Sequence, residues 1–323
     1  MKKMMTSLLT TAMAATATTV FATDSILWHF NGKDGVGTPT SITDTTGAFT
    51  LKRGQAIADG QTYGTQMTQS DSKGNIVRWT SGGVAHAESS AGSIQMWREN
   101  TSGGYRGGCS YYINDDIKTI LSTNSLGEIR SFTIELVYKA EPYDAATCQA
   151  KNMQLFVIGR GTNYGGGTPV LQVATTSTGN LWVIATSKIS GNGDICKWNA
   201  IDESIARDGK WHHLAIVYTL DESASPHQGT IELFLNYVSQ GTKTLTPTGT
   251  ATSPATGETT LSYGQWDESV VTKSWYAGYL TIGVTSKKHS PQLSIDEVRV
   301  TPCALDEDDF MRVRKTGFVM TID

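Results

Sequence analysis

The stretch DGKWHHLAIVY, residues 208–218, decides the fold class. Its second half, Leu214 to Tyr218, is apolar at every position. Such a short apolar run is typical of a strand that is buried on both faces. It predicts a central strand of a sheet, or a strand whose outer face is covered by a loop. Two further runs, Leu155 to Ile158 and Leu181 to Ala185, carry the same signal.

Other segments alternate with the two-residue period of a half-buried strand. Phe132, Ile134 and Leu136 fall on one face of one segment. A second segment places Ile231, Leu233 and Leu235 on one face, opposite Thr230 and Glu232. Strand-like runs of this kind recur from residue 25 to residue 300, separated by Gly, Asn, Asp and Ser clusters. The sequence therefore predicts an all-β protein.

Helical signals are few. We expect one short helix capped by Asn114, carrying Ile117, Ile120 and Leu121, and a second from near Asp306 to about residue 314. No alternation of strands with helices is present, which argues against a parallel α/β fold.

Composition and charge narrow the class of partner. Charged residues make up 17% of the 323 residues, and Gly is abundant at 33, as suits short strands joined by turns. The formal net charge is −4 and no cluster of Lys and Arg stands out. Because nucleic-acid binding needs a basic face, we expect no nucleic-acid partner.

The N-terminus predicts export. Lys2 and Lys3 precede an apolar and small-residue stretch, and Val20-Phe21-Ala22 has small residues where a signal peptidase needs them. We expect a signal peptide over residues 1–22 and a secreted or cell-envelope protein. A membrane anchor is the alternative, but many Thr interrupt the stretch, and no later segment is apolar enough to span a membrane.

Four cysteines lie outside the predicted signal peptide: Cys109, Cys148, Cys196 and Cys303. An even number in an exported chain permits two disulfides, in any of three connectivities. Buried thiols are the alternative. The long spacings between the four residues exclude a compact zinc module.

Several segments, taken in order, resemble laminin-G-like domains of exported bacterial proteins. The family's first strand, an early turn, two inner strands, a hairpin and two closing strands each have a counterpart here: SILWHF (25–30), DTTG (44–47), SFTIELVY (131–138), DGKWHHLAIVY (208–218), IELFLNYVSQGTKTL (231–245), LTIG (280–283) and LSIDEVRVTPCAL (293–305). The chain departs from the family at Asn236-Tyr237, where an Asn-Gly or Asp-Gly turn is usual.

The resemblance implies a concanavalin A-like jelly roll of two antiparallel sheets packed face to face. Alternating strands need a second apolar layer, and this arrangement supplies it. We expect one domain over residues 23–323. Because the chain is longer than most such domains, we interpret residues 63–112 and 246–275 as insertions.

Asp296 is the candidate metal ligand. Strand parity places its carboxylate on the face of Val298 and Val300, where a buried charge needs a partner or a metal. In the related family 16 glycoside hydrolases, a similar aspartate binds a structural calcium with backbone carbonyls. The resemblance thus implies a Ca²⁺ site formed by Asp296 with carbonyls near Asn31 and Gly47. A carboxylate that only accepts backbone N–H bonds or pairs with an arginine is the alternative.

We expect no enzyme. The related hydrolases carry an E-x-D-x-x-E strand, and this chain has none. It also lacks the Q-I-H and Y-x-K-x-G motifs of the alginate-lyase relatives. His212 and His213 point to opposite faces of a strand, so we interpret both as structural.

Trp266 and Trp275, with Asp267 beside the first, are the candidate ligand-binding residues. Exposed aromatic rings stack on sugar faces, and carboxylates bond sugar hydroxyls. Rings that only hold the insertion in place are the alternative, whereas Trp28, Trp182 and Trp211 are expected in the core. The sequence favours a non-catalytic module that binds carbohydrate or another extracellular polymer. A surface or matrix protein-interaction domain and a cryptic polysaccharide-active enzyme are the alternatives.

Overall fold

The computed structural model describes the strands and several of their connections. The described residues are 25–30, 41–55, 75–81, 92–98, 109–113, 120–121, 131–142, 153–160, 169–175, 180–186, 194–221, 223, 228–245, 278–283 and 292–311. The predicted signal peptide, Asn31, Cys148 and the segment with Trp266, Asp267 and Trp275 lie outside them. No helix in the described ranges is long and apolar enough to cross a membrane.

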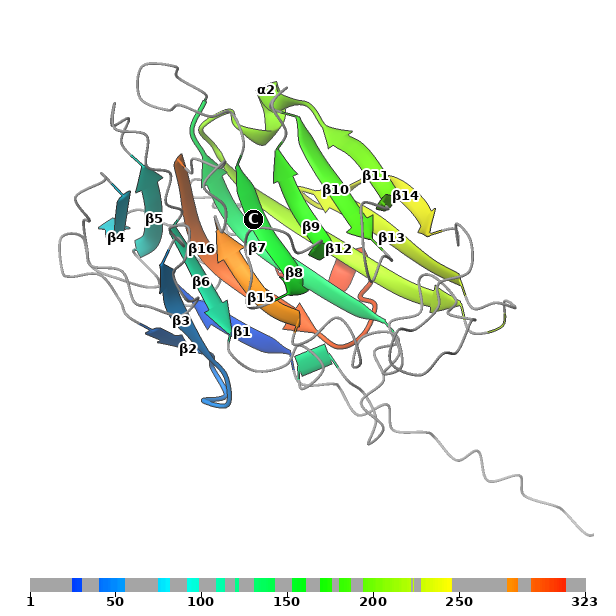
Figure 1. Ribbon diagram of the computed structural model, residues 1–323, viewed down its shortest axis with the longest axis horizontal. Coiled ribbons are helices and arrows are strands. Elements are labelled where there is room, and N and C mark those ends of the chain that lie inside the picture. The colour runs from blue at the N-terminus through cyan, green and yellow to red at the C-terminus, as the bar shows by residue number, and fades with distance from the viewer. Residues whose placement is uncertain are drawn as a thin grey trace, which may run out of the picture.

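The described strands form two antiparallel sheets of eight strands each (Figure 1). Sheet A has the order β14-β13-β12-β7-β16-β5-β4, and β1 also pairs with β16. Its strands are β1 (Ile26–His29), β4 (Asn75–Ser81), β5 (Gly92–Arg98), β7 (Phe132–Ala140), β12 (Trp211–Asp221), β13 (Gln228–Leu235), β14 (Val238–Leu245) and β16 (Gln292–Thr301).

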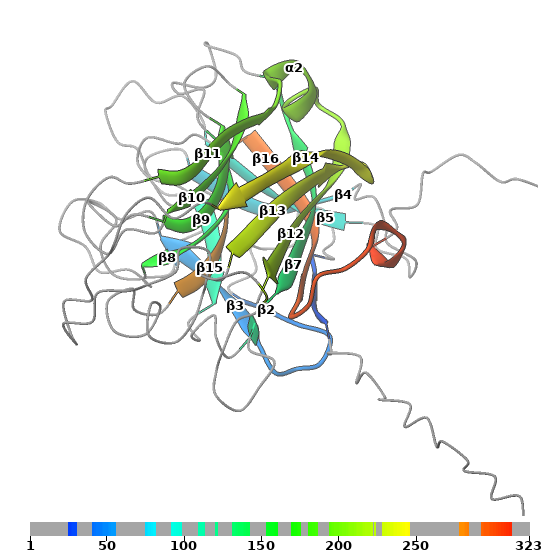
Figure 2. The same ribbon diagram turned by 90° about the vertical axis from the view of Figure 1, so that its right-hand side faces the viewer.

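Sheet B has the order β11-β10-β9-β8-β15-β6-β3-β2. Its strands are β2 (Ser41–Thr43), β3 (Thr50–Gln55), β6 (Cys109–Ile113), β8 (Gln154–Arg160), β9 (Pro169–Thr175), β10 (Leu181–Thr186), β11 (Asp194–Ile201) and β15 (Gly278–Gly283). The two sheets pack face to face, as the side view shows (Figure 2). The predicted all-β sandwich is confirmed.

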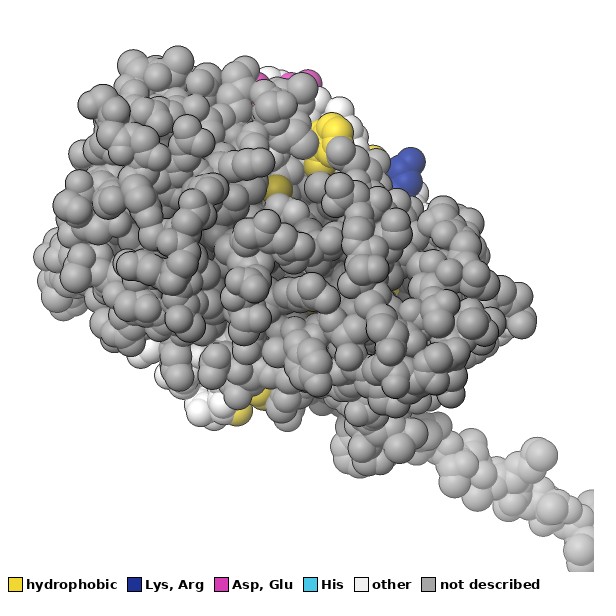
Figure 3. All heavy atoms as spheres, in the orientation of Figure 1, with side chains coloured by type: hydrophobic (Ala, Val, Ile, Leu, Met, Phe, Trp, Pro, Cys, Tyr) yellow, Lys and Arg dark blue, Asp and Glu magenta, His cyan; other side chains and the backbone are white. Residues whose placement is uncertain are grey.

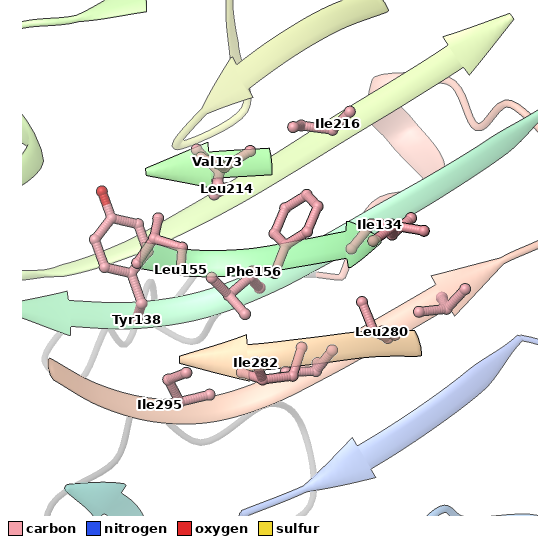
Figure 4. Packing of buried hydrophobic residues seen from close by; sticks show 14 of the residues in the cluster. Ile134, Tyr138, Leu155, Phe156, Val173, Leu214, Ile216, Leu280, Ile282 and Ile295 are labelled. Carbon is pink, nitrogen blue, oxygen red and sulfur yellow. The ribbon is translucent and has the colours of Figure 1, made fainter. Parts of the chain in front are cut away.

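The core lies between the sheets, and the predicted alternation holds there. Phe132, Ile134 and Leu136 of β7 are buried in it. Figure 4 shows Ile134, Tyr138, Leu214 and Ile216 of sheet A beside four labelled side chains of sheet B, Leu155, Phe156, Leu280 and Ile282. The three strands predicted to be central from their two-sided apolar runs, β8, β10 and β12, each have a neighbour on both sides.

The stretch predicted as an insertion over residues 63–112 contributes strands to both sheets. Within it, β4 and β5 extend sheet A and β6 joins sheet B. This part of the stretch is integral to the sandwich.

Helical structure is limited and differs in part from the prediction. Ile120 and Leu121 are helical and buried, as expected, while residues 114–119 lie outside the description. The helix predicted from Asp306 is a single 3-10 turn, Glu307–Asp309 (η1), which ends at Phe310. Helix α2 (Glu203–Ala206) was not predicted; Asp202 caps it by accepting a hydrogen bond from the Ser204 backbone N–H.

Tryptophan burial differs from the expectation at two positions. Trp28 is fully buried, as predicted, and its Nε1 donates to the carbonyl of Phe49. Trp182 and Trp211 are only half-buried, so placing them in the core was wrong. Trp182 alternates with the fully buried Leu181 and Val183 of β10, so its side chain points to the other face, and Trp211 is the first residue of β12.

In Figure 3 the described side chains of one face appear mainly at its margin. Acidic side chains show at the top margin, near α2, and an apolar patch and a Lys or Arg side chain lie to their right. Asp202 beside α2 is exposed, as is Ile205 within it.

Candidate functional site

One end of the sandwich gathers the ends of several connections; we call it the loop end. Figure 4 places Ile134, near the start of β7, and Leu280, near the start of β15, toward this end, and Tyr138 and Ile282 toward the other. Because all pairings are antiparallel, every strand direction in both sheets follows from these two. The loop end therefore holds the start of β15 and the end of β14.

Seven connections begin and end at the loop end: those that join β2 to β3, β4 to β5 and β6 to β7, and four more. The other four join β8 to β9, β10 to β11, β12 to β13 and β14 to β15, and they cover residues 161–168, 187–193, 222–227 and 246–277. Register fixes their ends: Gly278 pairs with Arg160, and Gly229 pairs with Leu245. The last connection starts on sheet A and finishes on sheet B.

The predicted ligand-binding residues belong to this last connection. Trp266, Asp267 and Trp275 all lie between Leu245 and Gly278. Their own positions are outside the described residues, but both ends of their segment are fixed at the loop end. The prediction that they form a binding platform stays a prediction.

Asp296, the predicted metal ligand, is fully buried in β16. The parity argument that assigned its face does not hold, because a β-bulge lies there: Ile295 pairs with Tyr138 and Glu297 pairs with the adjacent Val137. The Asp296 carbonyl accepts a hydrogen bond from the backbone N–H of Phe30, 2.8 Å away. The bulge lies where β16 changes partner along one edge, from β5 to β1.

Gly47, the second predicted contributor to the metal site, lies in a turn beside β1. Its φ of +78° suits glycine, and the Thr45 N–H in the same turn donates to the Leu27 carbonyl of β1. Asp44 closes this turn by accepting hydrogen bonds from the backbone N–H groups of Thr46 and Phe49. Burial alone would raise the pKa of Asp44, but hydrogen bonds from Thr46 and the backbone outweigh burial and lower it. Within the described ranges no group of three or more His, Cys, Asp or Glu side chains is placed to hold a metal.

A buried charged cluster that the sequence did not predict lies on the outer face of sheet A. Glu135 of β7 is fully buried. It accepts a hydrogen bond through Oε2 from Arg299 Nε, and His213 Nε2 lies 3.0 Å from its Oε1. Alternation placed Glu135 on the polar face, so solvent was the expected surrounding. We call Glu135, His213 and Arg299 the outer-face cluster.

The outer-face cluster is buried because a later segment folds over it. Residues 302–311, which we call the C-terminal strap, leave β16 and lie against β7 and β12 on the side away from sheet B (Figure 2). Phe310 and Met311 are buried, and Phe310 packs with Ala215 and Val217 of β12. The two-sided apolar run in β12 signalled a covering segment, but not which one.

A second histidine–glutamate pair lies along the same face. His29 Nδ1 of β1 lies 2.9 Å from Glu297 Oε1 of β16. Glu297 is 1% exposed and His29 is 30% exposed. The other carboxylate oxygen of Glu297 is buried and has no hydrogen-bond partner within the described part of the chain.

His212 takes different partners from His213, as expected for adjacent residues of one strand. Its Nε2 lies 2.8 Å from Asp208 Oδ1, and its Nδ1 lies 2.9 Å from Asn236 Nδ2. His213 instead stacks on the Tyr237 ring, with centroids 4.6 Å apart. His212 thus connects β12 to the turn before it and to the β13–β14 turn, and His213 connects β12 to β7.

The disulfide prediction stays open. Cys109 and Cys196 lie in β6 and β11, and Cys303 is half-buried just after β16. The Cys303 carbonyl accepts a hydrogen bond from Thr133 Oγ1, which fixes the start of the C-terminal strap.

Comparisons with known proteins place the chain in no family. No family model matches it, and no curated protein matches it either. Similar solved structures include the binding domain of Botulinum neurotoxin DC in complex with rat synaptotagmin II, at 11% identity and a TM-score of 0.47. The match covers 88% of this chain and 49% of that one, so the chain spans about half the length of that domain.

Two other solved structures show comparable likeness. The binding domain of Paraclostridial Mosquitocidal Protein 1 has 10% identity and a TM-score of 0.43, over 89% of this chain and 51% of that one. A Trypanosoma rangeli sialidase has 8% identity and a TM-score of 0.41, over 88% and 31%. With identities this low and TM-scores below 0.5, these likenesses establish nothing about the ligand or activity of this chain.

Proposed function

We propose that this protein is a non-catalytic module that binds carbohydrate or another extracellular polymer at the loop end. One observation carries the proposal: the strand directions bring both ends of seven connections to a single end of the sandwich. Loops presented together by a rigid sandwich are where β proteins commonly build binding sites. The connection with Trp266 and Trp275 is one of the seven.

The chemistry of these connections suits a sugar polymer. Residues 161–168 contribute Asn163 and Tyr164, and residues 246–277 contribute Trp266, Asp267 and Trp275. Aromatic rings stack on the apolar faces of sugar rings, and Asn and Asp side chains bond sugar hydroxyls. Many Thr, Ser and Gly residues in the same connections add further polar contacts.

Two carboxylates that are already engaged, the buried Glu135 and the half-buried Asp208, support a non-catalytic role. Glu135 is engaged by Arg299 and His213, and Asp208 by His212 and Lys210. A glycosidase needs one carboxylate as acid and a second as base or nucleophile, both facing the substrate. These carboxylates are instead committed to bonds that hold strands and turns in place.

The proposal includes the finer expectations from the sequence. We infer membership of the laminin-G-like jelly rolls, export after cleavage near residue 22, and a structural Ca²⁺ bound by Asp296. Full burial of Asp296 beside β1 supports the last of these, because a buried carboxylate needs a compensating charge or donors.

A glycan array combined with a polysaccharide panel tests the function. Purified protein without its signal peptide should bind one class of glycan and release no reducing sugar from the panel. Release of sugar would make the protein an enzyme. Binding to extracellular proteins and to no glycan would favour a protein-interaction domain.

A further inference from the structure

The contacts that hold the C-terminal strap use its main chain. Glu135 Oε1 accepts the Met311 N–H at 2.7 Å. Arg299 Nη2 donates to the Asp309 carbonyl at 2.7 Å, and Tyr237 Oη donates to the Met311 carbonyl at 2.9 Å. Three side chains from β7, β16 and the β13–β14 turn thus bond one short stretch of backbone.

Only two side chains of the strap's second half are buried. Phe310 and Met311 are 3% and 2% exposed, whereas the four acidic residues before them, at positions 306–309, are exposed. The Phe310 ring lies 5.0 Å from Phe234 and 5.8 Å from His213, centroid to centroid. The surface therefore selects an aromatic side chain and an apolar one, and tolerates polar residues before them.

The start of the strap has its own anchor. Thr133 Oγ1 donates to the Cys303 carbonyl and accepts the Leu305 N–H, both at 2.9 Å. This pair of bonds fixes residues 303–305 beside β7. The stretch from 306 to 311 then reaches the outer-face cluster as a separate, second attachment.

A buried ion pair is weak evidence for stability, because apolar residues of similar size often serve as well. The outer-face cluster can also bind a peptide backbone, because Glu135 offers a hydrogen-bond acceptor and Arg299 offers a donor. Main-chain bonds supply affinity and side-chain pockets supply selectivity in many peptide-binding sites. The geometry here has both parts.

We propose that the outer face of sheet A is a peptide-recognition groove, built by Glu135, Arg299, Tyr237 and the ring surfaces of Phe234 and His213. Its ligand is an extended peptide carrying an aromatic residue followed by an apolar one. In this chain the C-terminal strap fills the groove and blocks it. The groove lies on the outer face of sheet A and contains no residue of the connection with Trp266 and Trp275, so it is separate from the proposed glycan site.

A tethered strap competes strongly with a free peptide. A short tether gives an effective concentration on the order of millimolar, so the groove opens to a partner only when the strap is displaced. The groove is therefore an interaction surface that the chain itself keeps closed.

The test uses a fluorescent synthetic peptide with the sequence of residues 305–311. Its binding is measured by fluorescence anisotropy to the full chain and to the full-length double variant Phe310→Ala/Met311→Ala, which removes both buried side chains of the strap and so weakens its hold on the groove. We expect saturable binding to the variant and binding at least about tenfold weaker to the unaltered chain.

Matched peptides distinguish specific recognition by the groove from non-specific binding. N-methylation at the Met311 position removes the N–H that Glu135 accepts, and it should weaken binding to the variant at least about tenfold. Phe310→Ala in the peptide should do the same. Asp308→Asn alters an exposed position and should change nothing.

Two results overturn the proposal: no saturable binding to a double variant that still melts cooperatively, or equal binding of the N-methylated peptide. Should the double variant fail to fold, hydrogen exchange of the Met311 amide in the unaltered chain decides. Excess peptide should speed that exchange, and unchanged exchange also overturns the proposal. Glycan binding measured in parallel should be the same in all variants, so failure here leaves the proposed function standing.

Discussion

Asn236 and His212 are joined by a hydrogen bond of 2.9 Å between Nδ2 and Nδ1, although 24 residues separate them. The same asparagine donates its backbone N–H to the His213 carbonyl and accepts the His213 N–H through Oδ1. Its φ is +51° and that of Tyr237 is +69°. The β13–β14 turn is thereby clamped to the start of β12, and an asparagine tolerates the backbone angle that the turn needs.

The first prediction concerns this clamp. Asn236→Ala should destabilise the protein by about 2–4 kcal/mol, because it removes two partly buried side-chain hydrogen bonds and places alanine at a positive φ. Asn236→Gly loses the same side-chain bonds, but glycine adopts a positive φ without strain. Its loss of stability should therefore be about 1 kcal/mol smaller than that of Asn236→Ala. Urea unfolding followed by tryptophan fluorescence measures both. Equal losses for the two variants would mean that φ has no part in the choice of asparagine.

The second prediction concerns the outer-face cluster. Glu135→Gln should cost about 3–5 kcal/mol, because Arg299 is left beside a neutral amide with its charge partly buried. Glu141→Gln is the matched control: Glu141 also forms an ion pair, with Lys139, but is one-third exposed. Its loss should be below about 1 kcal/mol. Comparable losses in the two variants would contradict the burial that the C-terminal strap gives Glu135.

The third prediction concerns acid. Burial alone would raise the pKa of Asp208, but hydrogen bonds from His212 and Lys210 outweigh it and lower the pKa below 3.8. A carboxyl whose pKa is lower in the folded state stabilises above its unfolded value, and this stabilisation is lost as the pH falls through the folded value. Asp208→Asn should therefore cost about 1 kcal/mol or more near pH 5, and this cost should shrink as the pH falls below 3.8. The reverse order in urea unfolding would refute the assignment.

The fourth prediction concerns calcium. With calcium at about 100 times its Kd, a site specific to the folded state adds about 2.7 kcal/mol, so the melting temperature should rise above that in chelator. Asp296→Asn should abolish the rise. Scanning calorimetry in chelator and then in calcium measures the melting temperature. An unchanged melting temperature in both would contradict a calcium site at Asp296.

Strand parity predicted the inside of the sandwich well. Ile231, Leu233 and Leu235 are buried together as their spacing indicated, because a two-residue period follows directly from strand geometry. The same rule does not fix the face of Asp296, because one extra residue in β16 shifts the pairing with β7 there. A bulge leaves no mark in the pattern of apolar residues, so parity cannot anticipate it.

The local sequence pattern could not predict which segment covers the outer face of sheet A. Glu135 alternates with apolar neighbours like any solvent-facing residue, yet it is fully buried. The reason lies 176 positions away, where Met311 bonds it. Ala215 and Val217 indicated that something covers this face, since two small apolar side chains on the polar side of a strand need shelter.

The most direct test of the central claim is calorimetric titration of the best ligand from the glycan array. Trp266→Ala and Trp275→Ala are compared with Trp198→Phe, a matched control in β11, where the half-buried ring lies 5.7 Å from Lys243 Nζ. We expect Trp266→Ala and Trp275→Ala each to bind at least about tenfold more weakly, a loss of about 1.4 kcal/mol. The control Trp198→Phe should bind with unchanged affinity. Unchanged affinity in both Trp266→Ala and Trp275→Ala would contradict a glycan site at the loop end.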